Sequence, residues 1–115
     1  MSDPAYVPAQ GDFIWLALDP RTGREQSGDR PALVLSRREF AAVTGYAIIA
    51  PITSRVRGWP FEVLLPAGLD VVGAVLVDQS RSVDIAARRV RFVGHAAPAT
   101  LAEALGKLGA IVAPA

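Results

Sequence analysis

Residues 11–36 read GDFIWLALDPRTGREQSGDRPALVLS, and this stretch places one polar loop between two apolar runs. Residues 12–18 alternate and are rich in aromatic and β-branched side chains, which predicts a strand. Residues 31–36 are continuously apolar and predict a second strand. The loop between them, residues 19–30, holds two glycines, one proline and six charged side chains. Loops of this length in a small domain often carry function.

Short segments of β-forming residues follow this pair. Residues 37–44 end before Gly45 and predict one helical turn or a loop. Residues 46–53 predict a strand, and Pro51 near its end predicts an edge or a bulge there. A second polar loop is expected over residues 54–60 and a short turn over residues 78–81. Further strands are expected over residues 61–65, 74–77, 82–85 and 89–95.

The pattern becomes helical from Pro98, a residue suited to the first turn of a helix. Leu101, Leu105, Leu108 and Val112 recur at helical spacing and give this helix one apolar face. Several short strands followed by one terminal helix predict a mainly β (α+β) fold, a small and strongly bent barrel capped by the helix.

The composition fits one soluble domain over residues 1–115, because 51% of the residues are apolar and 20% are charged. No apolar run is long enough to cross a membrane. Residues 1–10 lack the basic start and apolar stretch of a signal peptide, so we expect a cytoplasmic protein. The absence of cysteine excludes disulfides and thiolate chemistry, and with His95 as the only histidine we expect no metal and no cofactor.

The basic residues are almost all arginine: one of the twelve, Lys107, is a lysine, so eleven are Arg. Arginine binds phosphate through two parallel hydrogen bonds and stacks on bases, which fits a nucleic-acid partner. A genome that favours Arg over Lys would give the same bias, and the net charge of +1 does not choose between the two.

Five motifs in order and in register resemble the MazF/PemK family of toxin ribonucleases, over roughly residues 6–112. They are Tyr6-Val7-Pro8 with the strand at residues 11–15, the stretch from Gly23 to Ser36, Pro51-Ile52-Thr53-Ser54, Gly58-Trp59-Pro60-Phe61-Glu62-Val63, and Val77-Asp78-Gln79 with Arg81-Ser82.

The resemblance implies an SH3-like barrel of five to seven strands with a C-terminal helix. It also implies a homodimer that a cognate antitoxin protein holds inactive. Members of the family cut single-stranded RNA and leave a cyclic phosphate and a free 5′-hydroxyl. The attacking group in such a reaction is the 2′-hydroxyl of the RNA, so no protein nucleophile is required.

The resemblance assigns Arg30 and Thr53 as the catalytic pair. Arginine suits the stabilisation of negative charge on the phosphorane, and a threonine hydroxyl suits donation to a phosphate oxygen. Glu25 matches a loop carboxylate that acts as general base. Without the resemblance, Arg30 reads as a solvated surface residue, Thr53 as an ordinary β-former and Glu25 as a loop solubility residue.

Substrate binding is expected at five further residues. Gln79 and Ser36 match positions near the substrate groove, Arg55 and Arg57 suit backbone phosphates beside the cut, and Asp78 either orients the substrate or caps a turn. PemK-type relatives have an arginine two residues before this aspartate, where this chain has Leu76. The Arg–Asp pair is therefore missing, which favours the set of Glu25, Arg30 and Thr53.

The sequence is compatible with two other functions. The same barrel also serves toxins that bind and poison DNA gyrase, so a binding module without catalysis is the main alternative. A decayed toxin that binds only an antitoxin is the other. Trp15 and Trp59 are expected to anchor the core or an interface, with stacking on bases as the less favoured alternative, and His95 is expected to be structural.

Overall fold

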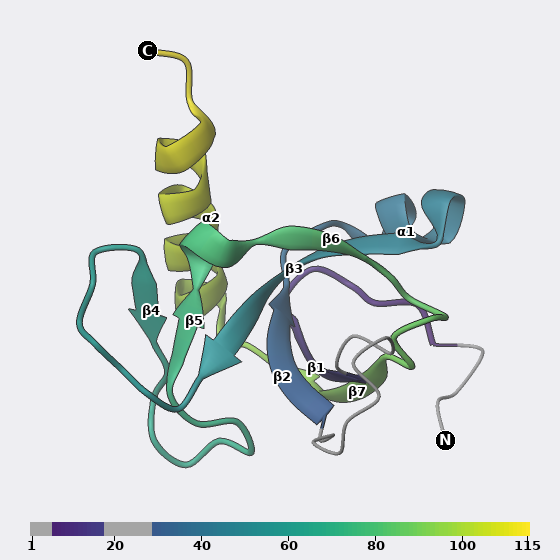
Figure 1. Ribbon diagram of the computed structural model, residues 1–115, viewed down its shortest axis with the longest axis horizontal. Coiled ribbons are helices and arrows are strands. Elements are labelled where there is room, and N and C mark those ends of the chain that lie inside the picture. The colour runs from purple at the N-terminus through teal and green to yellow at the C-terminus, as the bar shows by residue number, and fades with distance from the viewer. Residues whose placement is uncertain (1–5, 18–28) are drawn as a thin grey trace.

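The computed structural model describes residues 6–17 and 29–115 (Figure 1). Within these ranges seven strands, two α-helices and one 3₁₀ helix follow one another along the chain. The elements are β1 (Asp12–Ala17), β2 (Asp29–Val34), α1 (Arg38–Thr44), β3 (Tyr46–Thr53), β4 (Glu62–Leu64), β5 (Ala74–Leu76), η1 (Val77–Gln79), β6 (Arg81–Asp84), β7 (Arg91–His95) and α2 (Pro98–Val112).

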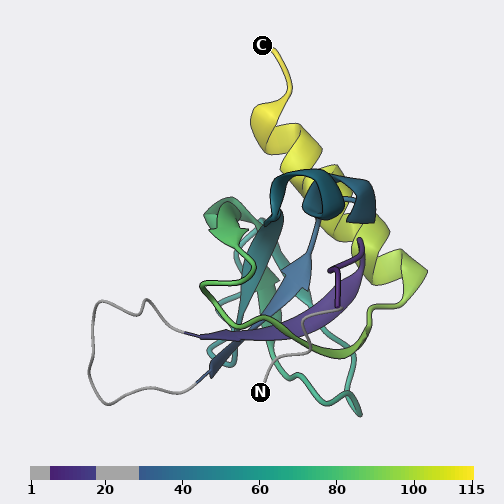
Figure 2. The ribbon, with the colours of Figure 1, turned by 90° about the vertical axis from the view of Figure 1, so that its right-hand side faces the viewer.

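The strands form one antiparallel sheet in the order β4-β5-β3-β2-β1-β7, with β6 also paired to β3. They curl around one another instead of lying in a flat layer (Figure 2). The predicted mainly β fold with seven strands and a terminal helix is confirmed. The sheet is open, however: in the part of the chain that the structure describes, β7 pairs only with β1, so the expected barrel is not closed.

Strand β3 is the branch point of this sheet. One side of β3 pairs with β2 through Ile49, Ala50 and Pro51. The other side pairs with β6 up to Ile49 and with β5 from Ile52 onward. Pro51 lies in the gap between these two ladders, where a residue without an N–H costs no hydrogen bond. Of the two alternatives predicted at Pro51, the sheet edge is wrong, because β3 is central. The interruption of one of its ladders is in keeping with the other alternative, a local irregularity such as a bulge.

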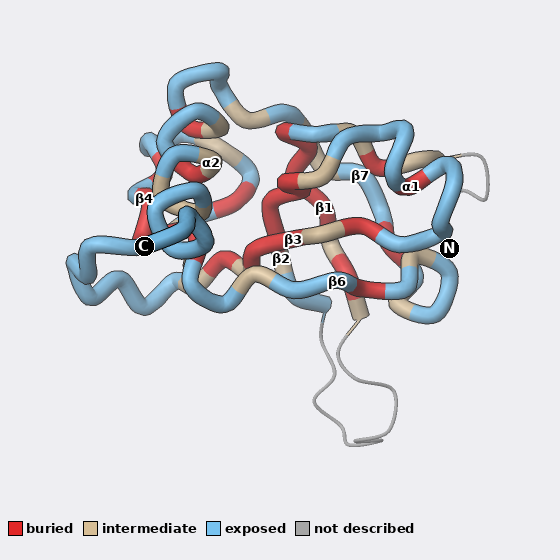
Figure 3. Tube along the Cα trace, turned by 90° about the horizontal axis from the view of Figure 1, so that it is seen from above, coloured by how far each residue is buried: buried red, intermediate tan, exposed pale blue. Residues whose placement is uncertain are grey.

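Two apolar clusters explain why β2 is hydrophobic at every position of its second half. Leu33 belongs to a cluster that includes Val75 and Ala104 of α2, whereas Ala32 and Val34 belong to a second cluster around Ile14 and Ile49. Alternate residues of a strand point to opposite faces, so β2 is buried on both. Figure 3 shows the buried positions running along β1, β2 and β3.

The two helices differ from the expectation in one respect each. α1 has seven residues, about two turns, and ends at Gly45 with a φ of 77°. The helix is therefore longer than the single turn or loop predicted over residues 37–44. α2 begins at Pro98 as predicted, and Leu105 and Leu108 pack on the core. Val112 is exposed, so the predicted apolar face does not reach the end of the helix.

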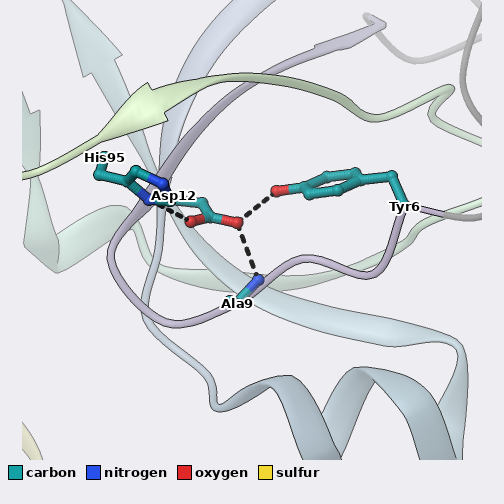
Figure 4. A network of polar contacts seen from close by, with 4 residues as sticks. All are labelled: Tyr6, Ala9, Asp12 and His95. Carbon is teal, nitrogen blue, oxygen red and sulfur yellow. Dashed lines mark hydrogen bonds and ion pairs between the residues drawn. The ribbon is translucent and has the colours of Figure 1, made fainter.

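A buried carboxylate ties the N-terminal segment to the sheet (Figure 4). Asp12 is 3% exposed, and its Oδ2 accepts hydrogen bonds from the Tyr6 hydroxyl at 2.6 Å and from the Ala9 N–H at 3.0 Å. The Nδ1 of His95 lies 3.0 Å from Oδ1. Burial, together with the hydrogen bond and charge of Asp12, raises the pKa of Tyr6. His95 therefore lies in a structural network.

Tyr6→Phe is expected to lower the free energy of unfolding by about 1.5–3 kcal/mol, because a buried carboxylate loses one of its hydrogen bonds. Urea unfolding followed by circular dichroism measures the loss. The control is Tyr46→Phe, since Tyr46 is exposed at the surface and its change should stay within about 0.5 kcal/mol. Equal effects of the two substitutions would contradict the role given to Asp12.

Candidate functional site

Three adjoining pockets form a groove where β2 and β3 approach the gap at Pro51. The first has a volume of about 200 Å³, the second about 110 Å³ and the third about 400 Å³. Arg30 lines the first and third pockets, Thr53 the second and third, and Gln79 the first and second. Because the pockets share these lining residues, they adjoin one another, and together they are called the groove below.

Arg30 and Thr53 come together through the register of β2 and β3. Ala32 faces Pro51 in that ladder, and two residues further along each strand the chain reaches Arg30 and Thr53. Opposite residues of an antiparallel pair point to the same face, and both residues line the third pocket. Arg30 is exposed, and Thr53 is half-buried. A cation and a hydroxyl are thus presented to one pocket.

The Thr53 hydroxyl is oriented by the chain that follows it. Its Oγ1 accepts a hydrogen bond from the Arg55 N–H at 3.0 Å. A hydroxyl that accepts in this way keeps its own proton available for donation. The same turn directs residues 54–60 along the second pocket, which Arg55 and Arg57 line.

The 3₁₀ helix η1 brings Asp78 and Gln79 to the groove. Both side chains are exposed and line the second pocket. The turn is closed by Ser80, whose N–H and hydroxyl donate to the Val77 carbonyl at 3.1 and 2.7 Å. Asp78 therefore faces the groove and is not needed as a turn cap. Leu76, where an arginine would stand in PemK-type chains, is an apolar wall of the same pocket.

One predicted residue, Ser36, is not brought into the groove. Ser36 lies just beyond β2, and its hydroxyl accepts a hydrogen bond from the Ile48 N–H at 2.9 Å. It lines none of the three pockets. Glu25 lies outside the described residues.

Sequence reasoning missed several groove residues. Arg81 and Arg88 line the first pocket with Arg30, and Trp59 and Glu62 line the second. Arg81 faces Ile49 across the β3–β6 ladder, so its place depends on that pairing. Arg88 is held by a hydrogen bond from its Nη1 to the Ala17 carbonyl at 3.2 Å, a contact that spans most of the chain.

Among the described residues that line the first pocket there are three arginines and no Asp or Glu, which favours a positive potential there. Such a surface attracts phosphate. Among residues 6–17 and 29–115, no three His, Asp or Glu side chains gather to hold a metal ion. No helix in those ranges is long and apolar enough to cross a membrane.

Known proteins share this chain's sequence and fold. The profile of the family described as PemK-like, MazF-like toxin of type II toxin-antitoxin system matches residues 9–112. The chain is 39% identical over 107 residues to the endoribonuclease toxin MazF of Escherichia coli, covering 93% of this chain and 96% of that protein. It is 40% identical over 109 residues to the endoribonuclease toxin ChpB of the same species, covering 90% and 92%.

A solved structure agrees. The MazE–MazF crystal structure (Form-II) from Deinococcus radiodurans matches with a TM-score of 0.88 and 47% identity, over 96% of this chain and 99% of the matched chain. The match of the profile, the identity and the shared fold extend over nearly the whole sequence. The chain therefore belongs to the PemK-like, MazF-like toxin family of type II toxin–antitoxin systems.

Proposed function

We propose that this protein is the toxin of a type II toxin–antitoxin system and cuts single-stranded RNA, mRNA above all, at short sequences, which inhibits translation and growth. The observation that supports the proposal most directly is the placement of Arg30 and Thr53 on one pocket of a groove rich in arginine. Curated relatives with 39% and 40% identity are named endoribonuclease toxins. The cytoplasm, where mRNA is translated, is the proposed site of action.

The proposed reaction is a transesterification within the RNA. The 2′-oxygen attacks the adjacent phosphorus, the bond from phosphorus to the 5′-oxygen breaks, and a 2′,3′-cyclic phosphate and a 5′-hydroxyl remain. Arg30 stabilises the negative charge of the phosphorane, because a guanidinium stays charged throughout. The Thr53 hydroxyl donates to a non-bridging phosphate oxygen. Glu25 takes the proton of the 2′-hydroxyl as general base, and one proton must reach the leaving 5′-oxygen.

Substrate binding is proposed along the rest of the groove. Arg55 and Arg57 hold phosphates beside the cut, and Asp78 and Gln79 contact the RNA from η1. Ser36 is proposed as a substrate contact because of the family resemblance, although its hydroxyl accepts a hydrogen bond from the Ile48 N–H. No cofactor is part of the proposed reaction.

Two protein partners are proposed as well. A cognate antitoxin with an acidic, flexible segment would lie over the arginines of the groove and block the RNA, and the solved Deinococcus radiodurans structure contains MazE with MazF. A second copy of this chain is expected to cover exposed apolar side chains and give a homodimer. RNA cleavage that continues undiminished when the antitoxin is added would contradict the first proposal, and a monomeric mass in dilute solution the second.

The proposed activity predicts cleavage of a long single-stranded RNA by the purified protein in EDTA. Discrete cuts are expected, with cyclic phosphates on one side and 5′-hydroxyls on the other, because the nucleophile belongs to the substrate. Mapping the product ends measures both the sites and the chemistry. A folded protein that cuts none of several RNAs would instead support a binding toxin of the gyrase-poison type or a decayed antitoxin-binding protein, and binding to gyrase and to an antitoxin would then be measured.

A further inference from the structure

In the described part of the chain, Trp59 is not buried in the core, and its side chain is open to solvent. Its side chain is 52% exposed, and it lines the second pocket together with Thr53. The guanidinium carbon of Arg57 lies over its ring, 5.0 Å from the centroid. An arginine stacked on an exposed indole gives a flat, cationic surface beside the proposed catalytic threonine.

The loop that presents this surface is held in a fixed shape by Glu62. This carboxylate is 7% exposed, and its Oε1 accepts hydrogen bonds from the N–H groups of Arg57 at 3.1 Å and Gly58 at 2.9 Å. Gly58 has a φ of 76°, a conformation that glycine adopts without strain. The Glu62 N–H donates to the Trp59 carbonyl at 3.1 Å. Arg57 and Trp59 are therefore positioned on either side of one rigid turn.

The terminal helix supports the same turn from behind. Lys107 of α2 donates from its Nζ to the Glu62 carbonyl at 2.8 Å and forms an ion pair with Glu103 at 3.1 Å. The turn is thus braced by the core side of the molecule, while the indole stays open to the groove. Preorganised aromatic surfaces of this kind bind unstacked bases with little loss of entropy.

We infer that the second pocket is a nucleobase subsite. An unstacked base of the single-stranded RNA, next to the phosphate held by Arg30 and Thr53, stacks on Trp59 with Arg57, and Asp78 and Gln79 face its hydrogen-bonding edge. This inference rests on the proposed ribonuclease function. Single-stranded RNA is read in this manner, by stacking on aromatic or arginine planes together with hydrogen bonds to base edges.

The Asp78 carboxylate determines which bases the subsite favours. An ionised carboxylate only accepts hydrogen bonds, so it favours a base that presents an exocyclic amino group. Uracil presents a single N–H between two carbonyl oxygens, and these oxygens repel a carboxylate. The subsite therefore takes adenine, cytosine or guanine in preference to uracil, while the Gln79 amide donates or accepts as the base requires.

Trp59 fluorescence tests the inference directly. The chain has two tryptophans, so a Trp15→Phe background leaves Trp59 as the only reporter. The probes are hexamers of adenosine, cytidine, guanosine or uridine with 2′-O-methyl groups, which lack the attacking hydroxyl and stay intact. We expect the first three to quench Trp59 more strongly than the uridine hexamer. Unchanged fluorescence while the anisotropy of a labelled hexamer reports binding would overturn the subsite.

Substitutions separate stacking from folding. Trp59→Ala is expected to weaken hexamer binding by about 5- to 150-fold, whereas Trp59→Phe keeps most of the affinity because the ring still stacks. In cleavage assays Trp59→Ala should raise KM more than it lowers kcat. Asp78→Asn should change the preferred base at one position of the cleavage site. Equal effects of Trp59→Ala and Trp59→Phe would overturn the stacking role.

The same variants distinguish the subsite from the ribonuclease function. If wild-type protein cuts RNA and Trp59→Ala cuts the same sites with the same KM, the subsite is wrong and the function stands. If wild-type protein cuts nothing but the hexamers still quench Trp59, the subsite stands and the function is wrong. If Trp59→Ala converts a dimer to a monomer without weakening hexamer binding, the surface belongs to a second copy of the chain and the subsite is wrong.

Discussion

Arg30→Ala is expected to slow RNA cleavage by about 10²–10³-fold, the usual effect of removing one group that stabilises charge in a transition state. Arg30 is exposed at the start of β2 and lines two pockets of the groove, so its loss removes positive charge where the phosphorane would form. The free energy of unfolding should change by less than about 0.5 kcal/mol, because little packing is lost. Single-turnover cleavage of a defined RNA, beside urea unfolding, measures both.

Arg37→Ala is the matched control. Arg37 is also an exposed arginine, but it precedes α1 and forms an ion pair with Glu39 at 3.6 Å. It lines none of the three pockets. Its replacement should leave the cleavage rate unchanged, whereas a general loss of positive charge would slow both variants alike. Equal rates for Arg30→Ala and wild type would remove Arg30 from the proposed mechanism.

Gly73→Ala is expected to cause the largest loss of stability, about 3 kcal/mol or more. Gly73 precedes β5 with a φ of 119°, and an added Cβ would lie 1.8 Å from the Thr53 carbonyl oxygen and 2.9 Å from the Ser54 Cα. The obstacles are backbone atoms, so the strands themselves must separate. The Thr53–Ala74 rung of the β3–β5 ladder is next to this contact, and its displacement should also reduce cleavage.

Gly68→Ala separates the clash from the backbone strain. Gly68 lies in the same connection between β4 and β5 with a φ of 91°, but a Cβ there would meet no atom within 4 Å. Only the cost of the left-handed conformation remains, about 1 kcal/mol. Thermal unfolding of the two variants measures the difference. If both lost the same stability, the close approach of Gly73 to Thr53 would not matter for folding.

The sequence predicted those elements whose local pattern and tertiary setting agree. The bounds of β3 and the start of α2 at Pro98 are as expected. In both elements, the apolar pattern that predicts the element is also the pattern that the fold buries. β2 begins earlier than predicted, at Asp29, since its pairing with β1 extends through Ala17. Local composition placed that charged residue in the loop, and only the partner strand moves it into the ladder.

The candidate site was partly predictable for a similar reason. Motifs pointed to Arg30 and Thr53, and the β2–β3 register brings the two positions together. Trp59 lay in a family motif without an assigned place in the groove, because its exposure depends on a turn closed by Glu62. Arg88 had no local signal, because its place depends on a contact with Ala17. The alternation of apolar residues indicates which side chains are buried. It does not indicate which exposed side chains the bent sheet brings together.

The interruption of the ladder on β3 affects stability and activity in opposite directions. One side of β3 has no backbone pairing beside Pro51, and the first pocket is lined by residues on both sides of that gap. A variant selected for thermal stability by closing the gap would lose the groove. Safer positions for stabilisation are Gly106 and Gly109 of α2, where an added methyl group meets no atom within 4 Å and the helix gains intrinsic propensity.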